Sequence, residues 1–199
     1  MIFGINAVQN PIEVGFVSSD QATLYSWDGL GQLESLSEYV AKKAPMDWKP
    51  EYVCSILGPG NYTGIRLALT YSKMVSKVLN VPLLGVSLFE AYAVLCPSSS
   101  LQVITSPSRK GSFNVQVFQQ QSQPISSIVQ VRVDQFDAWI SRFEMPIDWC
   151  HFGDIPEGIH AKGQSVHLDL LAWLRLPIGT LTTASIKSPT APVYSFNAA

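Results

Sequence analysis

Hydrophobic and polar residues alternate near the start of the chain in a way that predicts three β-strands. The predicted strands span residues 2–8, 12–18 and 22–27. In the second strand the apolar side chains Ile12, Val14 and Phe16 share one face, and short turns join the three segments into an antiparallel meander. Residues 30–43 instead carry apolar side chains at helical spacing, and Pro45 ends the predicted helix.

A glycine-rich elbow follows the next predicted strand, residues 52–57, and opens a second helix. Its glycines and proline predict a tight, stiff turn: Gly58, Pro59, Gly60 and Gly64. Thr63 is the predicted N-cap. The N–H groups at the helix start form a candidate anion site, and a purely structural turn is the alternative. The segment matches neither the P-loop motif nor the dinucleotide-binding fingerprint.

The helix after the elbow is apolar over well more than half of its circumference. Its polar residues form one narrow stripe: Arg66, Thr70, Lys73 and Lys77. The small residues Ala68, Ser72 and Ser76 recur at every fourth position, which would let another helix approach closely. Two interpretations stay open: the helix is enclosed within its own domain, or one of its faces binds a partner protein.

The remainder of the chain repeats the strand pattern of the beginning. A strand and a helix occupy residues 81–95, and the turn-rich segment 96–100 is the candidate boundary between two lobes, residues 1–97 and 98–199. The second lobe is predicted to contain strands at 101–105, 112–119 and 125–133, a hairpin turn at 119–124, a helix at 134–143 capped by Asp134, a strand ending at 151–153, a short helix at 167–174, and a loop-like tail from Pro177.

The elbow and the segments after it resemble the signature block of the bacterial TsaB family, also called YeaZ. The resemblance rests on Gly58-Pro-Gly-Asn-Tyr-Thr-Gly-Ile-Arg-Leu-Ala-Leu69, on Lys73, and on Val81-Pro-Leu-Leu-Gly-Val-Ser-Leu-Phe-Glu-Ala91. It covers about a sixth of the chain and keeps every glycine of the elbow, which makes it more specific than a short motif. Weaker similarities occur at Arg109-Lys110-Gly111 and at Pro192-Val193-Tyr194.

The resemblance implies an α/β fold of the actin, Hsp70 and sugar-kinase class, with two lobes of mixed sheets flanked by helices and a reduced second lobe. In that family the protein is catalytically silent. It is the required partner of a larger paralogue, TsaD, which holds the metal and transfers a threonylcarbamoyl group to an adenosine of certain tRNAs. The resemblance therefore implies a non-catalytic subunit that contacts tRNA only indirectly.

The resemblance also implies a heterodimer with a TsaD-like paralogue, formed by the helices after the elbow. The expected interface residues are Tyr62, Thr63, Arg66, Leu67, Leu69, Thr70, Ser72, Lys73 and Ser76. Ser72→Trp is expected to abolish pairing while the monomer stays folded. A TsaE-like ATPase is a candidate further partner, ATP or ADP is a candidate ligand at the partner interface, and the chain is expected to hold no cofactor of its own. Without its partner the exposed helix could form a homodimer.

Two departures from the family pattern concern acidic residues. Asn6 replaces the aspartate that the first strand of actin-like ATPases supplies, and Pro107 stands where a second family acid is usual. Hard cations prefer charged oxygen ligands, so a neutral Asn6 cannot hold a magnesium ion as a carboxylate would. The alternative function is a small kinase-like or peptidase-like enzyme with its own nucleotide or metal site, and the missing acid and the lack of paired histidines argue against it.

Composition limits the function further. The chain has 199 residues, 47% of them hydrophobic, and a net charge of −2 with only 14% charged residues. An autonomous tRNA-binding protein usually presents a basic face, whereas low charge with high apolarity favours a protein partner. We expect neither a signal peptide nor a membrane helix, and hence a cytoplasmic protein. The three cysteines and three histidines lack metal-ligand spacing, and Cys54 is expected to be a buried apolar side chain.

Overall fold

We describe a computed structural model of the chain. The described residues are 1–28, 33–46, 48–109, 111–119, 122–177 and 179–180. The chain divides into two compact units. The first contains residues Met1–Leu88 and the segment that begins at Asp169, and the second extends from Phe89 to Leu168. This division differs from the predicted boundary after residue 97, and it returns a late segment to the first unit.

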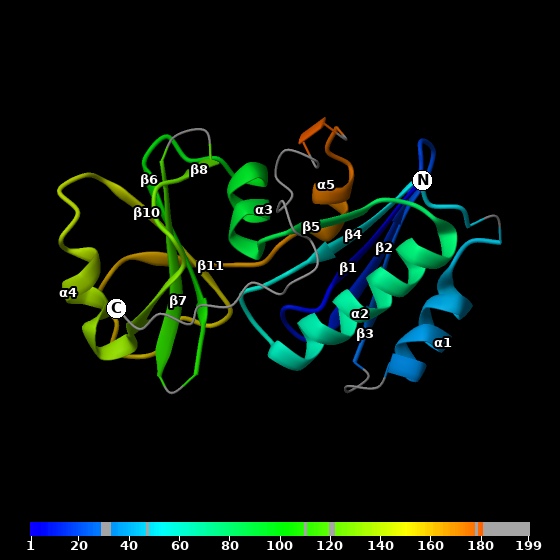
Figure 1. Ribbon diagram of the computed structural model, residues 1–199. Coiled ribbons are helices and arrows are strands. Elements are labelled where there is room, and N and C mark those ends of the chain that lie inside the picture. Colours follow the sequence, from blue (N-terminus) through cyan, green and yellow to red (C-terminus); the bar gives the residue numbers. More distant parts are fainter. Residues whose placement is uncertain (29–32, 47, 110, 120–121, 178, 181–199) are drawn as a thin grey trace. The chain divides into compact units, whose positions relative to one another are not determined.

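The first unit contains a five-stranded mixed sheet with the order β3-β2-β1-β4-β5. The strands are β1 (Ile2–Asn6), β2 (Ile12–Val17), β3 (Ala22–Trp27), β4 (Tyr52–Ile56) and β5 (Leu83–Val86). The first three strands form the predicted antiparallel meander, and β4 and β5 run parallel to β1. Helices α1 (Leu33–Lys43) and α2 (Tyr62–Leu79) cover one face of this sheet (Figure 1).

Alternation along the central strands explains how both faces of the first sheet are covered. Phe3 and Ile5 of β1 belong to the core that α1 and α2 complete. Gly4 points to the opposite face, where a Cβ atom would lie 2.7 Å from the side chain of Leu174. Leu174 belongs to the short helix α5 (Leu170–Leu174), which packs on β1 and β2. Asp169 caps this helix by accepting a hydrogen bond from the N–H of residue 172 at 2.9 Å.

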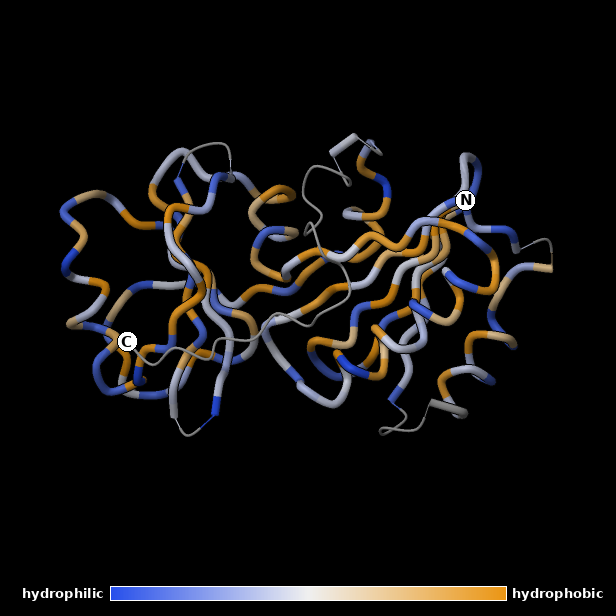
Figure 2. The backbone as a smooth tube through the Cα atoms, in the orientation of Figure 1, coloured by the Kyte–Doolittle hydropathy of each residue, from blue (hydrophilic) through white to orange (hydrophobic). Residues whose placement is uncertain are grey.

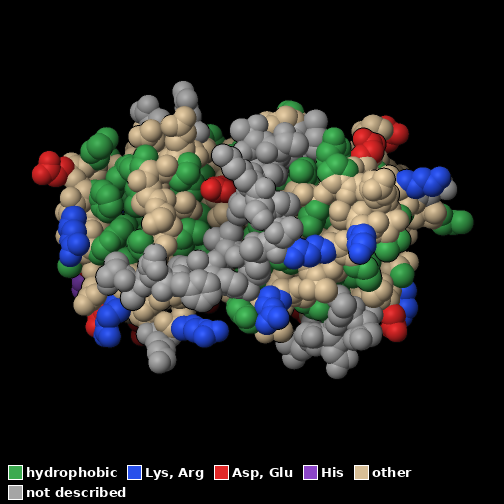
Figure 3. Space-filling view, in the orientation of Figure 1, with side chains coloured by type: hydrophobic (Ala, Val, Ile, Leu, Met, Phe, Trp, Pro, Cys, Tyr) green, Lys and Arg blue, Asp and Glu red, His purple; other side chains and the backbone are tan. Residues whose placement is uncertain are grey.

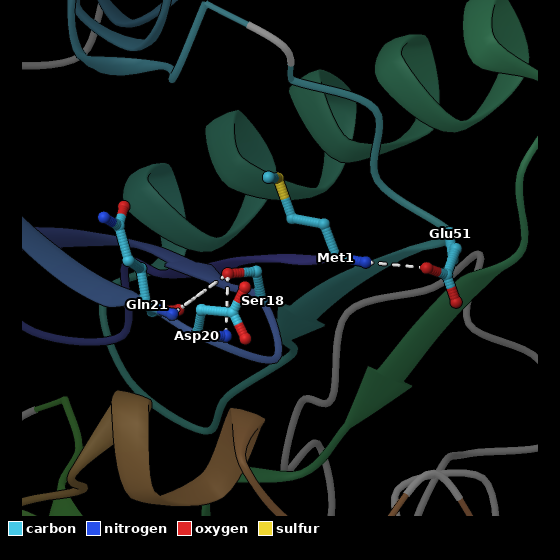
Figure 4. Close-up of polar contacts among 5 residues, drawn as sticks. All are labelled: Met1, Ser18, Asp20, Gln21 and Glu51. Atoms are coloured by element: carbon cyan, nitrogen blue, oxygen red, sulfur yellow. Dashed lines mark hydrogen bonds and ion pairs between the residues drawn. The ribbon is translucent and has the colours of Figure 1, made fainter.

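Polar contacts fix two margins of the first unit (Figure 4). The amino group of Met1 donates a hydrogen bond to Glu51 at 2.8 Å, which ties the start of β1 to the segment before β4. In the turn between β2 and β3, the hydroxyl of Ser18 accepts hydrogen bonds from the backbone N–H groups of Asp20 and Gln21. This turn is of the kind that serine favours, because its hydroxyl bonds to the backbone two or three residues later.

The second unit repeats the strand order of the first. Its sheet contains β6 (Leu101–Pro107), β7 (Ser112–Gln119), β8 (Gln123–Pro124), β9 (Val129–Arg132), β10 (Ile147–Phe152) and β11 (Gly163–Val166). Strands β6, β7 and β9 form an antiparallel meander, and β10 and β11 run parallel to β6. If the two-residue strand β8, which also pairs with β7, is left out, the strands of both units lie in the order third, second, first, fourth, fifth along the sheet. Hydrophobic residues concentrate along the strands of both sheets (Figure 2).

The helices of the second unit are short, as the sequence predicted. Among the residues that the structure describes, they include α3 (Leu88–Leu95), the 3-10 turn at Val133–Gln135 and α4 (Phe136–Ile140). The prediction that Asp134 caps a helix at 134–143 is wrong: Asp134 lies within the 3-10 turn and pairs instead with Arg132 at 2.6 Å. The sequence pattern did not predict β11, and it predicted that α5 begins at residue 167 rather than at Leu170. The predicted tail from 181 onward, with the similarity at 192–194, lies outside the described residues.

The glycine elbow and the outer face of helix α2

The elbow turns the chain from β4 into α2 with Asn61 as the N-cap. The carbonyl oxygen of the Asn61 side chain accepts a hydrogen bond from the N–H of Gly64 at 3.2 Å. Helix α2 begins at Tyr62, so the predicted cap, Thr63, already lies inside the first turn. That prediction is therefore wrong. Asparagine is as good an N-cap as threonine, and the positive φ of 104° at Gly58 lets the chain turn early.

The elbow glycines allow a close approach to the turn that follows β1. The N–H of Asn61 donates to the carbonyl oxygen of Val8 at 2.7 Å. A Cβ atom on Gly60 would lie 2.5 Å from the same carbonyl oxygen, and one on Gly64 would overlap the carbonyl oxygen of Ala7. Glycine is thus required at these two positions by backbone packing against the β1–β2 turn.

The hydrogen bonds of the elbow bear on the candidate anion site. The N–H groups of Asn61, Gly64 and Ile65 all donate within the chain, to the Val8 carbonyl, the Asn61 side chain and the Asn61 carbonyl respectively. Anion sites at helix starts depend on N–H groups that lack such partners. The geometry therefore favours the structural interpretation of the elbow.

Three of the residues expected at a partner interface are buried within the chain. Leu67 and Leu69 are 8% and 4% exposed, and Ser72 is fully buried. The small-residue row faces inward as well, since Ala68 is fully buried and the hydroxyl of Ser76 donates to the Val81 carbonyl at 2.6 Å. Leu67, Leu69 and Ser72 therefore lie on the side of α2 that packs against its own unit, and their assignment to a partner interface stays a prediction.

The exposed side of α2 carries five of the six remaining predicted residues, and the sixth, Ser76, is half-buried. We define the outer face of α2 as Tyr62, Thr63, Arg66, Thr70, Lys73, Met74, Lys77 and Val78, all of which are exposed. The guanidinium of Arg66 lies 5.3 Å from the ring centroid of Tyr62 and donates a hydrogen bond to its hydroxyl at 3.1 Å. Basic side chains lie along the course of α2, with hydrophobic side chains between them (Figure 3). The outer face is therefore a mixed basic and apolar surface.

Comparison with solved structures shows which fold this is. A YeaZ structure from Pseudomonas aeruginosa matches with a TM-score of 0.63 at 15% identity, covering 97% of this chain and 98% of that one. A second structure, of an uncharacterized protein with similarity to peptidase YEAZ from Pseudomonas aeruginosa, matches with a TM-score of 0.65 at 14% identity and the same coverage. The chain has the YeaZ fold. No model of a protein family matches the sequence, and no curated protein is similar to it in sequence.

The YeaZ fold confirms the predicted α/β class with two mixed sheets flanked by helices. Within it, Asn6 lies at the end of β1, where the resemblance led us to look for an acid. Its amide donates to the carboxylate of Glu13 at 2.9 Å, and its carbonyl oxygen accepts from the N–H of Val8 at 3.3 Å. Pro107 ends β6, and its carbonyl oxygen accepts from the amide of Asn114 at 3.2 Å. Both positions are thus occupied by groups with contacts inside their own unit.

The structure also reveals a buried polar cluster that the sequence did not indicate. In the second unit, the hydroxyl of Thr105 accepts a hydrogen bond from the indole of Trp149 and lies 2.8 Å from Nδ1 of His151. His151 is fully buried, and its ring centroid lies 4.8 Å from that of Phe113. Burial lowers the pKa of His151 to about 4. Only the alternation of β6 and β10 could have suggested that Thr105 and His151 face one core.

The other candidate ligands do not converge. Cys54 is buried in β4 as expected, and burial raises the pKa of its thiol to about 12. In the described part of the chain, no group of three or more histidine, cysteine or acidic side chains is arranged to hold a metal ion. Among the same residues, no helix combines the length and apolar character needed to cross a membrane.

Proposed function

We propose that this chain is a TsaB (YeaZ) protein and acts as the partner subunit of a TsaD-like paralogue in the formation of N6-threonylcarbamoyladenosine in tRNA. The observation that carries the proposal is the coincidence of motif and fold. The residues that resemble the TsaB signature, 58–91, form the elbow, α2, β5 and the start of α3. They do so in a chain whose fold matches YeaZ structures over nearly the full length of both chains.

The subunit is proposed to be non-catalytic. Two observations support this part of the proposal. The amide of Asn6 is paired with Glu13 where a nucleotide-hydrolysing relative would present a carboxylate. Two N–H groups of the elbow, those of Asn61 and Gly64, donate to the Val8 carbonyl and to the Asn61 side chain, which reduces the number of donors that a phosphate could use there. Any ATP or ADP would therefore be held together with the partner, and the tRNA would be bound mainly by that partner.

The outer face of α2 is the proposed contact surface. It is a continuous strip of exposed side chains on an 18-residue helix. Met74 and Val78 contribute exposed apolar area to it, at 42% and 76% of their full exposure. Large apolar side chains are usually covered when they recur along one helix face, so this strip fits a protein interface better than a purely solvated surface.

A reconstitution experiment tests the proposal. The purified chain is mixed with the TsaD-like paralogue from the same genome, and complex formation and modified tRNA are measured with and without ATP. We expect a complex, and modification that depends on this chain. Absence of a complex, or equal modification without the chain, would refute the proposal, and ATP hydrolysis by the isolated chain would favour an enzyme of the same fold.

Two matched variants locate the contact surface. Val78→Asp places a charge on the outer face of α2 and should weaken the complex about tenfold or more. Met145→Asp makes the same kind of change at an exposed apolar side chain of the second unit, 64% exposed, and should leave binding unchanged. Equal effects of the two variants would mean that the interface lies elsewhere.

A further inference from the structure

Two cysteines that are far apart in the sequence meet in the second unit. Cys96 directly follows helix α3 and is exposed, whereas Cys150 is buried in β10. The hydroxyl of Tyr92, on α3, lies within hydrogen-bonding reach of both thiols. The two sulfur atoms are therefore separated by little more than one hydroxyl group.

The packing of α3 on β10 places the two cysteines together independently of that hydroxyl. Cys150 and Phe152 lie on the same face of β10, because side chains alternate along a strand. The ring of Phe152 packs edge-on against the ring of Tyr92, with centroids 5.3 Å apart. The N–H of Cys96 donates to the carbonyl oxygen of Tyr92 at 2.8 Å, so Cys96 lies one helical turn further along. The end of α3 therefore covers the face of β10 that carries Cys150.

Two glutamine amides hold the cysteines in these positions. The amide nitrogen of Gln102, on β6, donates to the carbonyl oxygen of Cys96 at 3.0 Å, and the same side chain hydrogen-bonds the Cys150 thiol. The amide nitrogen of Gln164, which lies opposite Cys150 on β11, donates to its sulfur at 3.3 Å. Gln102 thus links the backbone of one cysteine to the sulfur of the other.

The two thiols differ in how readily an oxidant in solution reaches them. Cys96 is exposed, whereas Cys150 is buried, and burial raises the pKa of the Cys150 thiol. Oxidation of cysteine follows exposure and thiolate character, and redox-sensing cysteines often lie next to a second cysteine that resolves the oxidised form. The structure therefore distinguishes a first thiol, Cys96, from a resolving thiol, Cys150.

We propose that Cys96 and Cys150 form a peroxide-sensitive pair that closes a reversible disulfide between the end of α3 and β10. Hydrogen peroxide transfers one oxygen atom to the Cys96 sulfur as its O–O bond breaks, which gives a sulfenic acid and one water molecule. The Cys150 sulfur then attacks the Cys96 sulfur, and the S–O bond breaks as the S–S bond forms. The Cys150 thiol, which donates to Asp148 at 3.8 Å, loses its proton, and this proton and the departing hydroxide form a second water molecule. The two sulfurs lose two electrons in total, and the peroxide gains them.

Other roles for the pair fit the contacts less well. Among the described residues, no group of three or more histidine, cysteine or acidic side chains is arranged to hold a metal ion. Packing alone accounts for Cys150, a small buried side chain, but not for the exposed Cys96 beside the same hydroxyl. Helix ends fray, so the residue after α3 can adjust to the strict geometry of a disulfide more easily than a residue within a strand. This inference does not depend on the proposed function.

Titration of the purified wild-type chain with hydrogen peroxide tests the inference. The remaining thiols are alkylated in denaturant, and the intact mass and the digested peptides are measured. We expect the number of alkylated cysteines to fall from three to one, with a cross-linked pair of peptides that contain Cys96 and Cys150. Dithiothreitol should restore all three thiols. Thiols that stay reduced, oxidation of Cys96 to sulfinic acid without a cross-link, or disulfides only between separate chains would each overturn the inference.

Single cysteine variants separate the two roles. Cys150→Ser removes the resolving thiol, so the sulfenic acid of Cys96 should accumulate and its labelling by dimedone should rise about fivefold or more over the wild type. Cys54→Ser, at a buried cysteine of the first unit, is the matched control and should cross-link as the wild type does. Equal dimedone labelling of the wild type and Cys150→Ser would refute the resolving role.

Cys96→Ser supplies an independent test, because its exposed position makes the change compatible with folding even if Cys150→Ser does not fold. This variant should form no cross-link, and Cys150 should stay reduced at peroxide concentrations that cross-link the wild type. Oxidation of Cys150 at the same rate in Cys96→Ser and in the wild type would show that Cys96 is not the first thiol to react, and the inference would fail.

Discussion

Protonation of His151 should destabilise the second unit in mild acid. The imidazole is fully buried on the core side of β10, beside Thr105, Trp149 and Phe113. Its Nδ1 atom can donate to the Thr105 hydroxyl while that hydroxyl donates to the carbonyl of residue 150, at 3.3 Å. This arrangement suits the neutral ring. A second proton would place a positive charge in an apolar core, which is why burial lowers the pKa to about 4.

The sign and size of the effect follow from linkage. A histidine in the unfolded chain has a pKa of about 6.5, so between pH 6.5 and pH 4 the unfolded state binds more protons than the folded state. The stabilisation is complete above pH 6.5 and is lost as the pH falls towards 4. The free energy of unfolding should fall by about 2 kcal/mol between pH 7.5 and pH 5, and by about 3 kcal/mol once the pH is below 4.

Urea unfolding followed by tryptophan fluorescence measures this loss, because Trp149 lies beside His151 and reports on the second unit. His151→Gln removes the titration but keeps an amide able to bond to Thr105, so its stability should depend less on pH than that of the wild type, by about 2 kcal/mol over this range. His167→Gln, at an exposed histidine, is the control. If wild type and His151→Gln lose the same stability between pH 7.5 and pH 5, the buried cluster does not titrate as argued.

Three further predictions concern packing and polar contacts. The expectation that Ser72→Trp leaves the monomer folded does not fit the burial of Ser72, and this change should instead cost about 3 kcal/mol or more and unfold the first unit. Thr70→Trp, on the exposed side of α2, should not unfold it, and circular dichroism during heating separates the two variants. Gly163→Ala should cost about 1–3 kcal/mol in urea unfolding, because its methyl group would overlap the indole of Trp149. The carboxylate of Asp137 accepts hydrogen bonds from two backbone N–H groups, which lower its pKa. Asp137→Asn should therefore be less stable than the wild type at neutral pH. In urea unfolding at decreasing pH, this difference should disappear as the wild-type carboxylate is protonated.

Most strands and helices of the first unit could be predicted, because each depends mainly on residues that are close together in the sequence. Alternation in residues 2–6 and 12–17 shows which side chains share a face, and the elbow is marked by closely spaced glycines. The class of each element therefore followed from residues adjacent to it. The antiparallel pairing of the first three strands then followed from the short turns between them, since sequential strands usually pair. The pairing of β4 with β1 was not predicted.

Features that depend on distant residues could not be predicted in the same way. In the sequence, Gly4 is a residue without a side chain in the middle of a predicted strand. Only the structure shows that its lack of a side chain makes room for Leu174. Similarly, β11 has mostly exposed residues and lacks an alternating pattern, so its pairing with β10 is invisible in its own sequence. The assignment of the segment from Asp169 to the first unit also depends on distant residues, because this segment packs against the first sheet.

Helix α2 shows where a pattern argument reaches its limit. An apolar surface wider than half a helix has two explanations, enclosure by the home unit or a partner, and side-chain polarity cannot distinguish them. The structure assigns Leu67, Leu69 and Ser72 to enclosure. What remains on the outer face is chiefly the polar stripe that would ordinarily be regarded as solvated. The same face also exposes Met74 and Val78, so a single charge placed at position 78 tests for a contact with a partner while leaving the buried side of the helix, and hence the fold, intact.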